Sequence, residues 1–354
     1  IGCAAIGFLL MAKITEYTSA TEASFVYLVK PVLATALAVA VYGEHISTNR
    51  MIGIALFVLS SLCVSAPLLR ALTLLLISFA CLSVLTAPAA PPVTEEKARP
   101  AGELSAEEIL ASSRTVMHGL GQLSGTSVLN CREGFDRYYA RGARVFEVDL
   151  RMTSDGQVVL RHDWRGGWQE GISELSIPTR DAFLAAPLLE RYTPMSFRDL
   201  LLLMEEYPDI CIVTDTKFTD AEVVTAQFTA MLNDAHELGL SYLFDRMVIQ
   251  VYSPLMFRVV DHLGHFPHYI YTFYAEGFNG TEEALRERLT FCRKNGIEGV
   301  TMWSWLWRPS YAAIAENSGV RCYVHTVNDR ETAEALLQSG VSAVYTDYLV
   351  LHED

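Results

Sequence analysis

Hydrophobic and polar residues follow two different patterns along the chain. Residues 1–90 contain four apolar runs with few charges, at 1–11, 23–42, 51–67 and 71–85. From residue 105 onward, short apolar runs alternate with amphipathic segments. The first pattern is typical of membrane helices, because a helix needs about 20 apolar residues to cross a bilayer. The second pattern predicts strands that alternate with helices, and therefore a parallel sheet.

The alternating pattern defines the expected elements of the second region. Strands are expected at 115–118, 144–151, 158–162, 210–217, 247–252, 269–273, 299–303, 321–326 and 343–347. Helices are expected at 132–140, 196–207, 221–237, 254–262, 282–294, 310–316 and 330–337. Eight strand–helix units fit the roughly 250 residues of a (β/α)₈ barrel. The strand at 158–162 and the aperiodic segment 164–191 are expected to form an excursion between the second and third units. We therefore predict an α/β fold, a (β/α)₈ TIM barrel preceded by transmembrane α-helices.

The apolar front is expected to consist of two parts. Residues 1–70 are predicted to form transmembrane helices, and the absence of an initial Met indicates a portion upstream of Ile1. Residues 71–90 have the layout of a signal peptide, with Arg70 before the apolar run and Ala87-Pro88-Ala89 after it. This segment is therefore either a cleaved signal or an anchoring helix. Residues 91–104 form a Pro-rich linker, and residues 105–354 form the barrel.

Charge is distributed as unevenly as hydropathy. The chain is 51% hydrophobic with a mean hydropathy of +0.23. Residues 1–90 hold four of the 27 basic and three of the 41 acidic residues, which leaves 23 basic and 38 acidic, a net charge of −15, for 91–354. Such a domain has no electrostatic reason to bind nucleic acid or an anionic membrane surface. The seven cysteines contain no C-x-x-C and no spacing typical of zinc sites.

Two acids stand close together on one predicted strand. Glu147 and Asp149 are two residues apart, so their side chains share a face of the strand at 144–151. A solvated polar face is one interpretation, but Val145 and Val148 are among the apolar neighbours of a strand that looks buried on both sides. Two buried acids repel each other unless a cation or a proton lies between them. The pattern therefore favours a metal ion.

Other polar residues fall where the remaining strands are predicted to end. In a (β/α)₈ barrel the catalytic groups lie at the carboxyl ends of the strands. Taken singly, each of these residues has an ordinary structural explanation. A histidine could simply be hydrogen-bonded within a loop, and Asp215 and Lys217 could form a structural ion pair. Their joint placement favours an active site. The residues at or near these ends are His118, Glu147, Asp149, His162, Asp215, Lys217, Gln250, Tyr252, Trp303, Trp305, His325 and Asp347.

Several motifs in this region resemble glycerophosphodiester phosphodiesterases, within the phosphatidylinositol-phospholipase-C-like phosphodiesterase superfamily. They occur in order as MHG at 117–119, Asn130, FEVDLRMTSDGQVVLRHD at 146–163, TDTK at 214–217, VHTVND at 324–329 and GVSAVYTD at 340–347. The resemblance implies a phosphodiester hydrolase whose divalent cation is held by Glu147, Asp149 and Asp215. It further implies His118 and His162 as the acid/base pair and Lys217 as a phosphate contact.

The sequence departs from the pattern of this family at four positions. The usual H-R-G is His118-Gly119-Leu120, the usual Glu before Asn130 is Leu129, the third metal ligand is Asp rather than Glu, and the usual Trp-Thr is His325-Thr326. Three carboxylates are the ligands expected for Mg²⁺ or Ca²⁺. Trp303 and Trp305 are candidates for an apolar wall beside a glycerol or acyl group. The predicted substrate-binding residues are Asn130, Gln250, Tyr252, Trp303, Trp305 and His325.

The front resembles the last two helices of EamA-type drug/metabolite transporters. The resemblance rests on Pro31 within the second run, on Gly43-Glu44 at its end and on Gly53 in the next run. It implies a membrane-associated chain, and Arg70 on the inner side would place the barrel outside the cytoplasm. We expect an exported or tethered hydrolase of glycerophosphodiesters. The alternatives are an enzyme acting on a lysophospholipid or phosphoinositide, a catalytically weak binding module attached to a transporter, and transport itself.

Overall fold

The structure, a computed structural model, describes residues 97, 104–165, 167–264 and 266–351. The chain divides into two compact units, Ile1–Pro91 and Pro92–Asp354. The predicted membrane helices at 1–70, the signal-like segment at 71–90 and most of the linker lie outside the described residues. Within the described ranges, no helix has both the length and the apolar character needed to cross a membrane.

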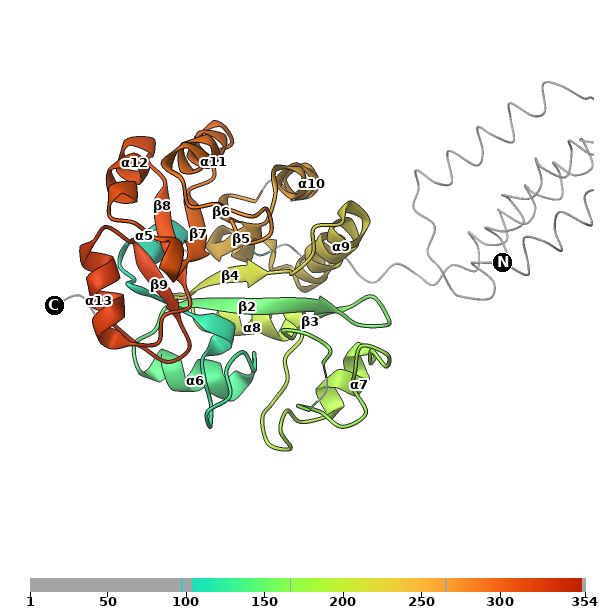
Figure 1. The fold of residues 1–354 in the computed structure, drawn as a ribbon. Coiled ribbons are helices and arrows are strands. Elements are labelled where there is room, and N and C mark those ends of the chain that lie inside the picture. Colours follow the sequence, from blue (N-terminus) through green and yellow to red (C-terminus); the bar gives the residue numbers. More distant parts are fainter. Residues whose placement is uncertain (1–96, 98–103, 166, 265, 352–354) are drawn as a thin grey trace, which may run out of the picture. The chain divides into compact units, whose positions relative to one another are not determined.

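Eight parallel strands form a closed barrel, as predicted (Figure 1). The sheet order is β1-β9-β8-β7-β6-β5-β4-β2, and β1 also pairs with β2, which closes the ring. Each strand carries an apolar run buried on both faces, as expected of a parallel sheet covered by helices. The strands are β1 Thr115–Met117, β2 Val145–Met152, β4 Cys211–Asp215, β5 Met247–Val251, β6 His268–Thr272, β7 Gly299–Trp303, β8 Arg321–His325 and β9 Ala343–Thr346.

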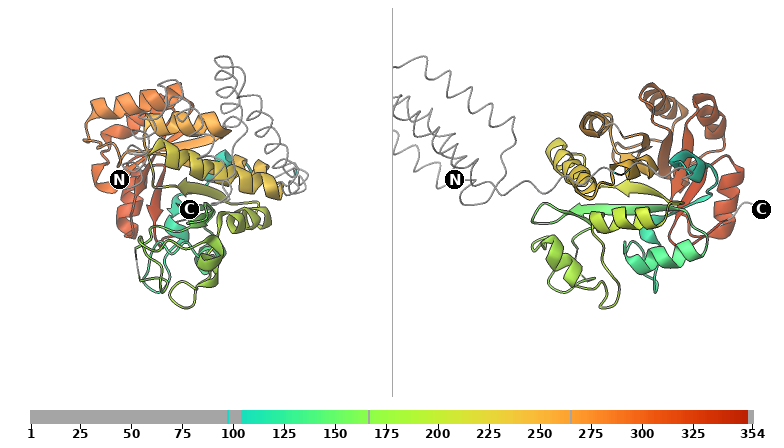
Figure 2. Two further views of the ribbon diagram at one scale, coloured as in Figure 1. Left: turned by 90° about the vertical axis from the view of Figure 1, so that its right-hand side faces the viewer. Right: turned by 180° about the vertical axis from the view of Figure 1, so that it is seen from behind.

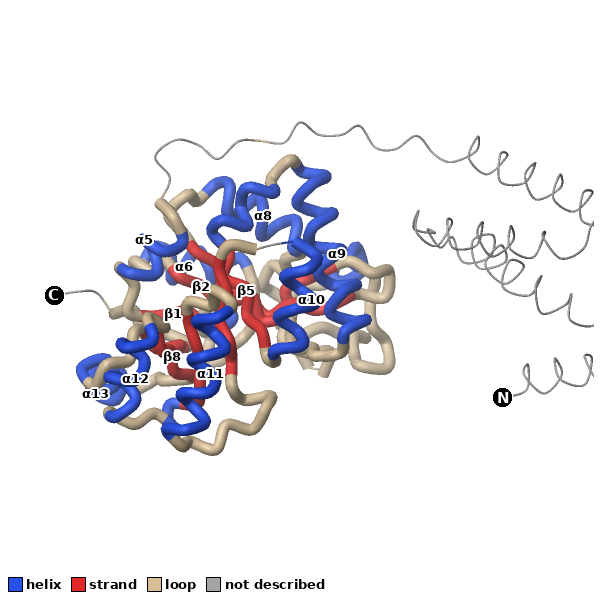
Figure 3. The backbone as a smooth tube through the Cα atoms, turned by 90° about the horizontal axis from the view of Figure 1, so that it is seen from above, coloured by secondary structure: helices blue, strands red, loops and turns tan. Residues whose placement is uncertain are grey.

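The seven predicted helices are all present and surround the strands (Figures 2 and 3). Ser196 caps α8 with a capping box completed by Asp199. These helices are α6 Arg132–Ala140, α8 Phe197–Glu206, α9 Ala221–Leu238, α10 Pro254–Gly264, α11 Glu282–Lys294, α12 Ser310–Ser318 and α13 Arg330–Gln338.

Five short elements were not predicted. Two are six-residue helices, α5 (Ala106–Ala111) and α7 (Arg180–Ala185), which are too short to show a helical period. The start of α5 does have a local signal, because Ser105 and Glu108 form a capping box. The other three are 3₁₀ turns: η1 His118–Leu120, η2 Ser241–Arg246 and η3 Ser304–Leu306.

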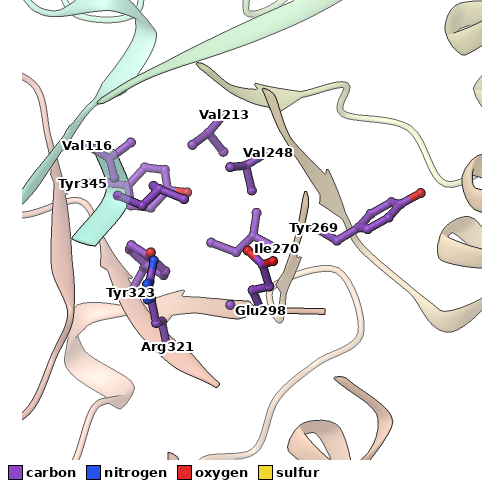
Figure 4. A pocket seen from close by; sticks show the side chains of 11 residues that line it. Val116, Val213, Val248, Tyr269, Ile270, Glu298, Arg321, Tyr323 and Tyr345 are labelled. Carbon is purple, nitrogen blue, oxygen red and sulfur yellow. The ribbon is translucent and has the colours of Figure 1, made fainter. Parts of the chain in front are cut away.

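The amino-terminal end of the barrel is filled with apolar side chains. Ile109 and Leu110 of α5 pack there against inward-facing residues such as Val116, Val145 and Val213. The space left between the side chains at this end has a volume of about 10 Å³, room for about one water molecule (Figure 4). This end of the barrel is therefore a packed core, and the polar residues gather at the opposite end.

The predicted excursion is present between β2 and α8. It begins with β3 (Val158–Leu160), which pairs antiparallel with the last residues of β2, beyond the part of β2 that pairs with β4 (Figure 1). The following segment is anchored by Arg161, which is almost fully buried and donates hydrogen bonds to the carbonyl oxygens of Asp163 and Arg165. The excursion thereby carries His162 and Asp163 to the carboxyl ends of the neighbouring strands.

Candidate active site

Three buried carboxylates meet at the carboxyl ends of β2 and β4. The register of these strands pairs Asp149 with Asp215, and Glu147 lies two residues before Asp149, on the same face of β2. One carboxylate oxygen of each residue lies within 4.8 Å of the others. Their exposed fractions are only 2%, 0% and 4% for Glu147, Asp149 and Asp215. The predicted shared face is thus correct, and Asp215 joins it from the next strand of the sheet.

Neighbouring polar groups hold two of these acids in place. The backbone N–H of Gly119 donates to Glu147 Oε2 at 2.7 Å. Asn130 Nδ2 donates to Asp149 Oδ2 at 2.8 Å, while Asn130 Oδ1 accepts from the Asp149 backbone N–H at 2.9 Å. Asn130, predicted as a substrate contact, therefore uses both ends of its amide to position Asp149. Its substrate contact remains a prediction.

A single ammonium group lies among the three acids. Lys217 Nζ is 2.7 Å from Asp149 Oδ1 and also contacts Asp215. Burial and the nearby Asp149 carboxylate raise the pKa of Glu147 to about 8. Burial also raises the pKa of Asp215, whereas for Asp149 the charges of Lys217, His162 and His118 together outweigh burial and lower the pKa. One lysine cannot neutralise three carboxylates, so the cluster retains an affinity for further positive charge.

The donor set fits a hard divalent cation. All three side chains offer oxygen atoms, which suits Mg²⁺ or Ca²⁺ better than zinc. Apart from the Lys217 contact, Asp149 Oδ1 makes no hydrogen bond to the described residues although it is fully buried. Glu147, Asp149 and Asp215 could therefore hold such a cation, with the latter two shared between it and the Lys217 ammonium.

His118 lies directly after β1, at the start of η1, and is paired with an acid. Its Nδ1 is 2.8 Å from Asp347 Oδ1, and Asn328 Nδ2 donates to Asp347 Oδ2 at 2.7 Å. Burial disfavours the imidazolium, but the Asp347 hydrogen bond and the carboxylates of Glu147 and Asp149 outweigh burial and raise the pKa of His118 to about 9. His118 is therefore protonated at neutral pH in this arrangement.

His162 follows β3 and has its own carboxylate partner. Its Nδ1 is 2.8 Å from Asp163 Oδ2, and Asp163 is fixed by the backbone N–H of Arg165. Positive charge on either ring would lower the pKa of Asp149, so both histidines lie within electrostatic range of that carboxylate. The His118 and His162 side chains are 23% and 36% exposed, whereas the three acids are buried.

The remaining predicted substrate residues lie along β5 to β8. The Tyr252 hydroxyl accepts a hydrogen bond from the Lys217 backbone N–H at 3.1 Å, and Gln250 donates to Tyr252 at 3.4 Å. Trp303 packs on His325 with ring centroids 4.6 Å apart. Trp305 is 74% exposed, and its ring stacks on none of the described aromatic residues.

His325 is a neutral member of this wall. Burial, assisted by the charges of His118 and Lys217, lowers the pKa of His325 to about 3. Its Nδ1 is 2.8 Å from Thr301 Oγ1. The ring packs against Tyr274 as well as Trp303, at a centroid distance of 5.7 Å from Tyr274. The wall is therefore aromatic and uncharged, on the side of the barrel opposite to β2.

Sequence reasoning missed several residues that belong to the site. Asp347 was recognised at a strand end but was given no catalytic role, because only the barrel closure brings β9 beside β1 and His118. Tyr274 follows β6. Burial and the nearby carboxylates of Asp215 and Glu147 raise the pKa of Tyr274. The Thr-Asp pair at the end of β9 was the available signal for Asp347. No signal in the sequence marked Tyr274.

Comparisons with solved structures identify the type of barrel. The described domain is a parallel α/β barrel with the fold of glycerophosphodiester phosphodiesterases. A candidate glycerophosphoryl diester phosphodiesterase from Silicibacter pomeroyi superposes with a TM-score of 0.56 at 18% identity, covering 67% of this chain and 91% of that one. A phosphodiesterase from Oleispira antarctica, solved with the product sn-glycerol-3-phosphate, gives 0.55 at 14% identity over 69% and 96%. A glycerophosphodiester phosphodiesterase from Parabacteroides distasonis gives 0.53 at 16% over 67% and 93%.

The front of the chain matches a different family. Residues 1–66 match the EamA-like transporter family. This match confirms the resemblance of the front of the chain to EamA-type transporters and implies association with a membrane. An uncharacterized transporter from Clostridium kluyveri is 41% identical over 58 residues, 16% of this chain and 19% of that protein. The chain therefore spans about a fifth of the length of this curated relative.

The raised pKa of Glu147 predicts opposite effects of one substitution on stability and on metal binding. Above its ordinary pKa near 4.5, burial of ionised Glu147 costs stability increasingly until about pH 8. Glu147→Gln should therefore raise the metal-free unfolding free energy at pH 8 by on the order of 1–3 kcal/mol. It should also remove most of the stabilisation that Mg²⁺ or Ca²⁺ gives to the wild type. Thermal unfolding of the full chain, with EDTA and with each metal, measures both effects.

Glu298→Gln is the matched control, because Glu298 lies at the opposite, apolar end of the barrel. An equal metal-induced rise in melting temperature for wild type and Glu147→Gln would contradict the proposed ligand set.

Proposed function

We propose that residues 105–354 form a metal-dependent phosphodiesterase that hydrolyses glycerophosphodiesters to an alcohol and glycerol phosphate. The observation that carries this proposal is the convergence of three buried carboxylates, one lysine and two acid-paired histidines at one end of the barrel. The fold shared with glycerophosphodiester phosphodiesterases supports it. The Oleispira antarctica enzyme was solved with glycerol phosphate as product, which supports the same substrate class.

The two histidines take opposite roles in this proposal. His162, at the more exposed position, accepts the proton of the attacking hydroxyl, which belongs either to water or to the substrate's own alcohol. His118, which holds its proton through Asp347, donates it to the oxygen of the leaving alcohol. Each such proton transfer contributes typically ~10²–10⁴ to a rate. The attacking oxygen bonds to phosphorus as the P–O bond to the leaving group breaks, and the leaving oxygen departs as a neutral hydroxyl. If the substrate's own alcohol attacks, this step gives a cyclic phosphate, which water then opens to the glycerol phosphate.

Other groups hold the phosphate and orient the acids. A divalent cation bound by Glu147, Asp149 and Asp215 would act as a Lewis acid and neutralise phosphate charge. Lys217 adds a positive charge at the same edge of the sheet. The aromatic wall of Tyr274, Trp303 and His325 would face the alcohol portion of the diester.

Hydrolysis of defined diesters by the full chain tests this function. Glycerophosphocholine should be cleaved in the presence of Mg²⁺ or Ca²⁺, and EDTA should abolish the reaction. His162→Ala should lower kcat at least ~10²-fold because it removes the general base. The control is His262→Ala, since His262 is exposed on α10. Activity that survives EDTA, or that survives His162→Ala, would refute the assignment.

A second candidate substrate is a lysophospholipid or phosphoinositide. The observation that favours it is the exposure of Trp303 and Tyr274, 42% and 37%, at the mouth of the barrel, where an acyl chain could contact them. Adding these lipids to the same substrate panel separates the two candidates. Turnover of water-soluble diesters alone excludes the lipid. Binding of metal and diester without any turnover would instead assign the barrel as a binding module.

The His118–Asp347 pair predicts a shift in pH dependence. His118 must be protonated to act as the acid, so activity should fall as the pH rises through about 9. In Asp347→Asn the hydrogen-bonded charge is lost while burial remains, so the alkaline limb of the kcat profile should move down by at least about one pH unit. Asp136→Asn, a surface acid on α6, is the control. An unmoved alkaline limb would show that His118 is not the acid.

We also propose that the barrel lies outside the cytoplasm. The signal-like segment at 71–90 and the transporter-like segment before it support this placement. Protease added to intact cells should then degrade the barrel. Protection until the cells are lysed would place it in the cytoplasm.

A further inference from the structure

Arg151 occupies a position next to the proposed phosphate site. It lies near the end of β2, two residues beyond Asp149 and therefore on the same face as Glu147 and Asp149. Its Nε–H donates to the carbonyl oxygen of His162 at 2.9 Å. Its guanidinium carbon is 4.8 Å from the centre of the Phe218 ring, and Phe218 directly follows Lys217. The Arg151 side chain thus lies between the segments that carry His162 and Lys217.

Among the described residues, Arg151 differs from its neighbours in having no carboxylate within ion-pair distance. Lys217 contacts two carboxylates, and His118 and His162 contact one each. In the described part of the chain, Arg151 makes no ion pair with any carboxylate, although it is only partly exposed. It is thus a partly desolvated cation beside an acidic cluster without a direct counter-ion.

Such a cation has the chemistry of an anion-binding group. A partly buried charge is costly unless it is paired, so an arriving anion would be stabilised here more than at an exposed arginine. A guanidinium has five N–H donors in a planar fork that matches two phosphate oxygens, and only Nε–H is used in a described hydrogen bond. The bond to His162 and the Phe218 ring hold the fork in one orientation, which lowers the entropy lost on binding.

We propose that Arg151 binds the phosphate group of the ligand through its remaining N–H groups. The ligand class is a phosphodiester or a phosphate monoester with two free oxygens on one face. This inference rests on the proposed function and adds a phosphate-binding residue to it. The competing explanation is that Arg151 only positions His162 through the carbonyl contact.

The proposal can be tested without turnover by measuring how tightly the full chain binds inorganic phosphate. Calorimetry measures this affinity once in the presence of Mg²⁺ and once in the presence of Ca²⁺. Arg151→Gln should weaken phosphate binding about tenfold to a hundredfold, the loss expected for a hydrogen bond to a charged group. Arg151→Lys should fall between Arg151→Gln and the wild type, because it keeps the charge but loses the fork. Thermal unfolding of each variant verifies that it is folded. If Arg151→Gln does not fold, the phosphate affinity of Arg151→Lys relative to the wild type tests the proposal.

Arg144→Gln is the matched control. Arg144 precedes the first residue of the same strand, its guanidinium carbon also lies over an aromatic ring, Tyr139 at 4.2 Å, and it also donates to backbone carbonyl oxygens. It differs in having a counter-ion, Asp209 at 2.7 Å, and in lying at the opposite end of β2. Arg144→Gln should bind phosphate as the wild type does.

The outcomes separate this inference from the function on which it rests. Phosphate affinity within twofold of the wild type in a folded Arg151→Gln would overturn the inference, and a lower kcat with that affinity would assign Arg151 to positioning His162. A wild type that binds no phosphate would overturn it as well. Arg151-dependent phosphate binding in a chain that cleaves no diester would uphold the inference and refute the proposed hydrolysis.

Discussion

The structure depends on keeping three carboxylates together out of water. Buried acids within 4.8 Å of one another repel, and their charges favour the folded state only if compensating groups are in place. The fold supplies these groups from separate parts of the chain: the Lys217 ammonium, the Asn130 amide and the Gly119 backbone N–H. The apolar packing at the opposite end of the barrel stabilises the fold and so offsets the unfavourable free energy of this buried cluster.

The same constraint separates the barrel into two halves with different tasks. At the amino-terminal end, α5 and the inward-facing valines fill the interior almost completely. At the carboxyl ends, His118 and His162 are each paired with a carboxylate, and the rings of Tyr274, Trp303 and His325 form an uncharged wall. The acids, His118 and His162 are concentrated near β1, β2, β4 and β9, whereas the aromatic rings follow β6 to β8. A bound diester would thus meet a charged side and an apolar side.

The sequence was sufficient for the barrel and for the acids, and the reasons are local. Apolar runs with turns between them mark buried parallel strands, and the two-residue spacing of Glu147 and Asp149 fixes a shared face without any knowledge of the tertiary structure. Asp347 and Arg151 could not be assigned in this way. The role of Asp347 depends on β9 closing against β1, and that of Arg151 depends on contacts with His162 and Phe218. Short helices such as α5 and α7 escaped because six residues do not display a helical period.

The alternation along β2 has a consequence for how function is linked to folding. Glu147, Asp149 and Arg151 stand at every second position of one strand, at intervals of about 6.6 Å, and its register is fixed by β4 on one side and by β3 beyond the ring. A slip of one residue would turn all three side chains toward the helices at once. The geometry of β2 thus sets the distance between the acid cluster and the Arg151 guanidinium. The chain either has both, at the correct separation, or has neither.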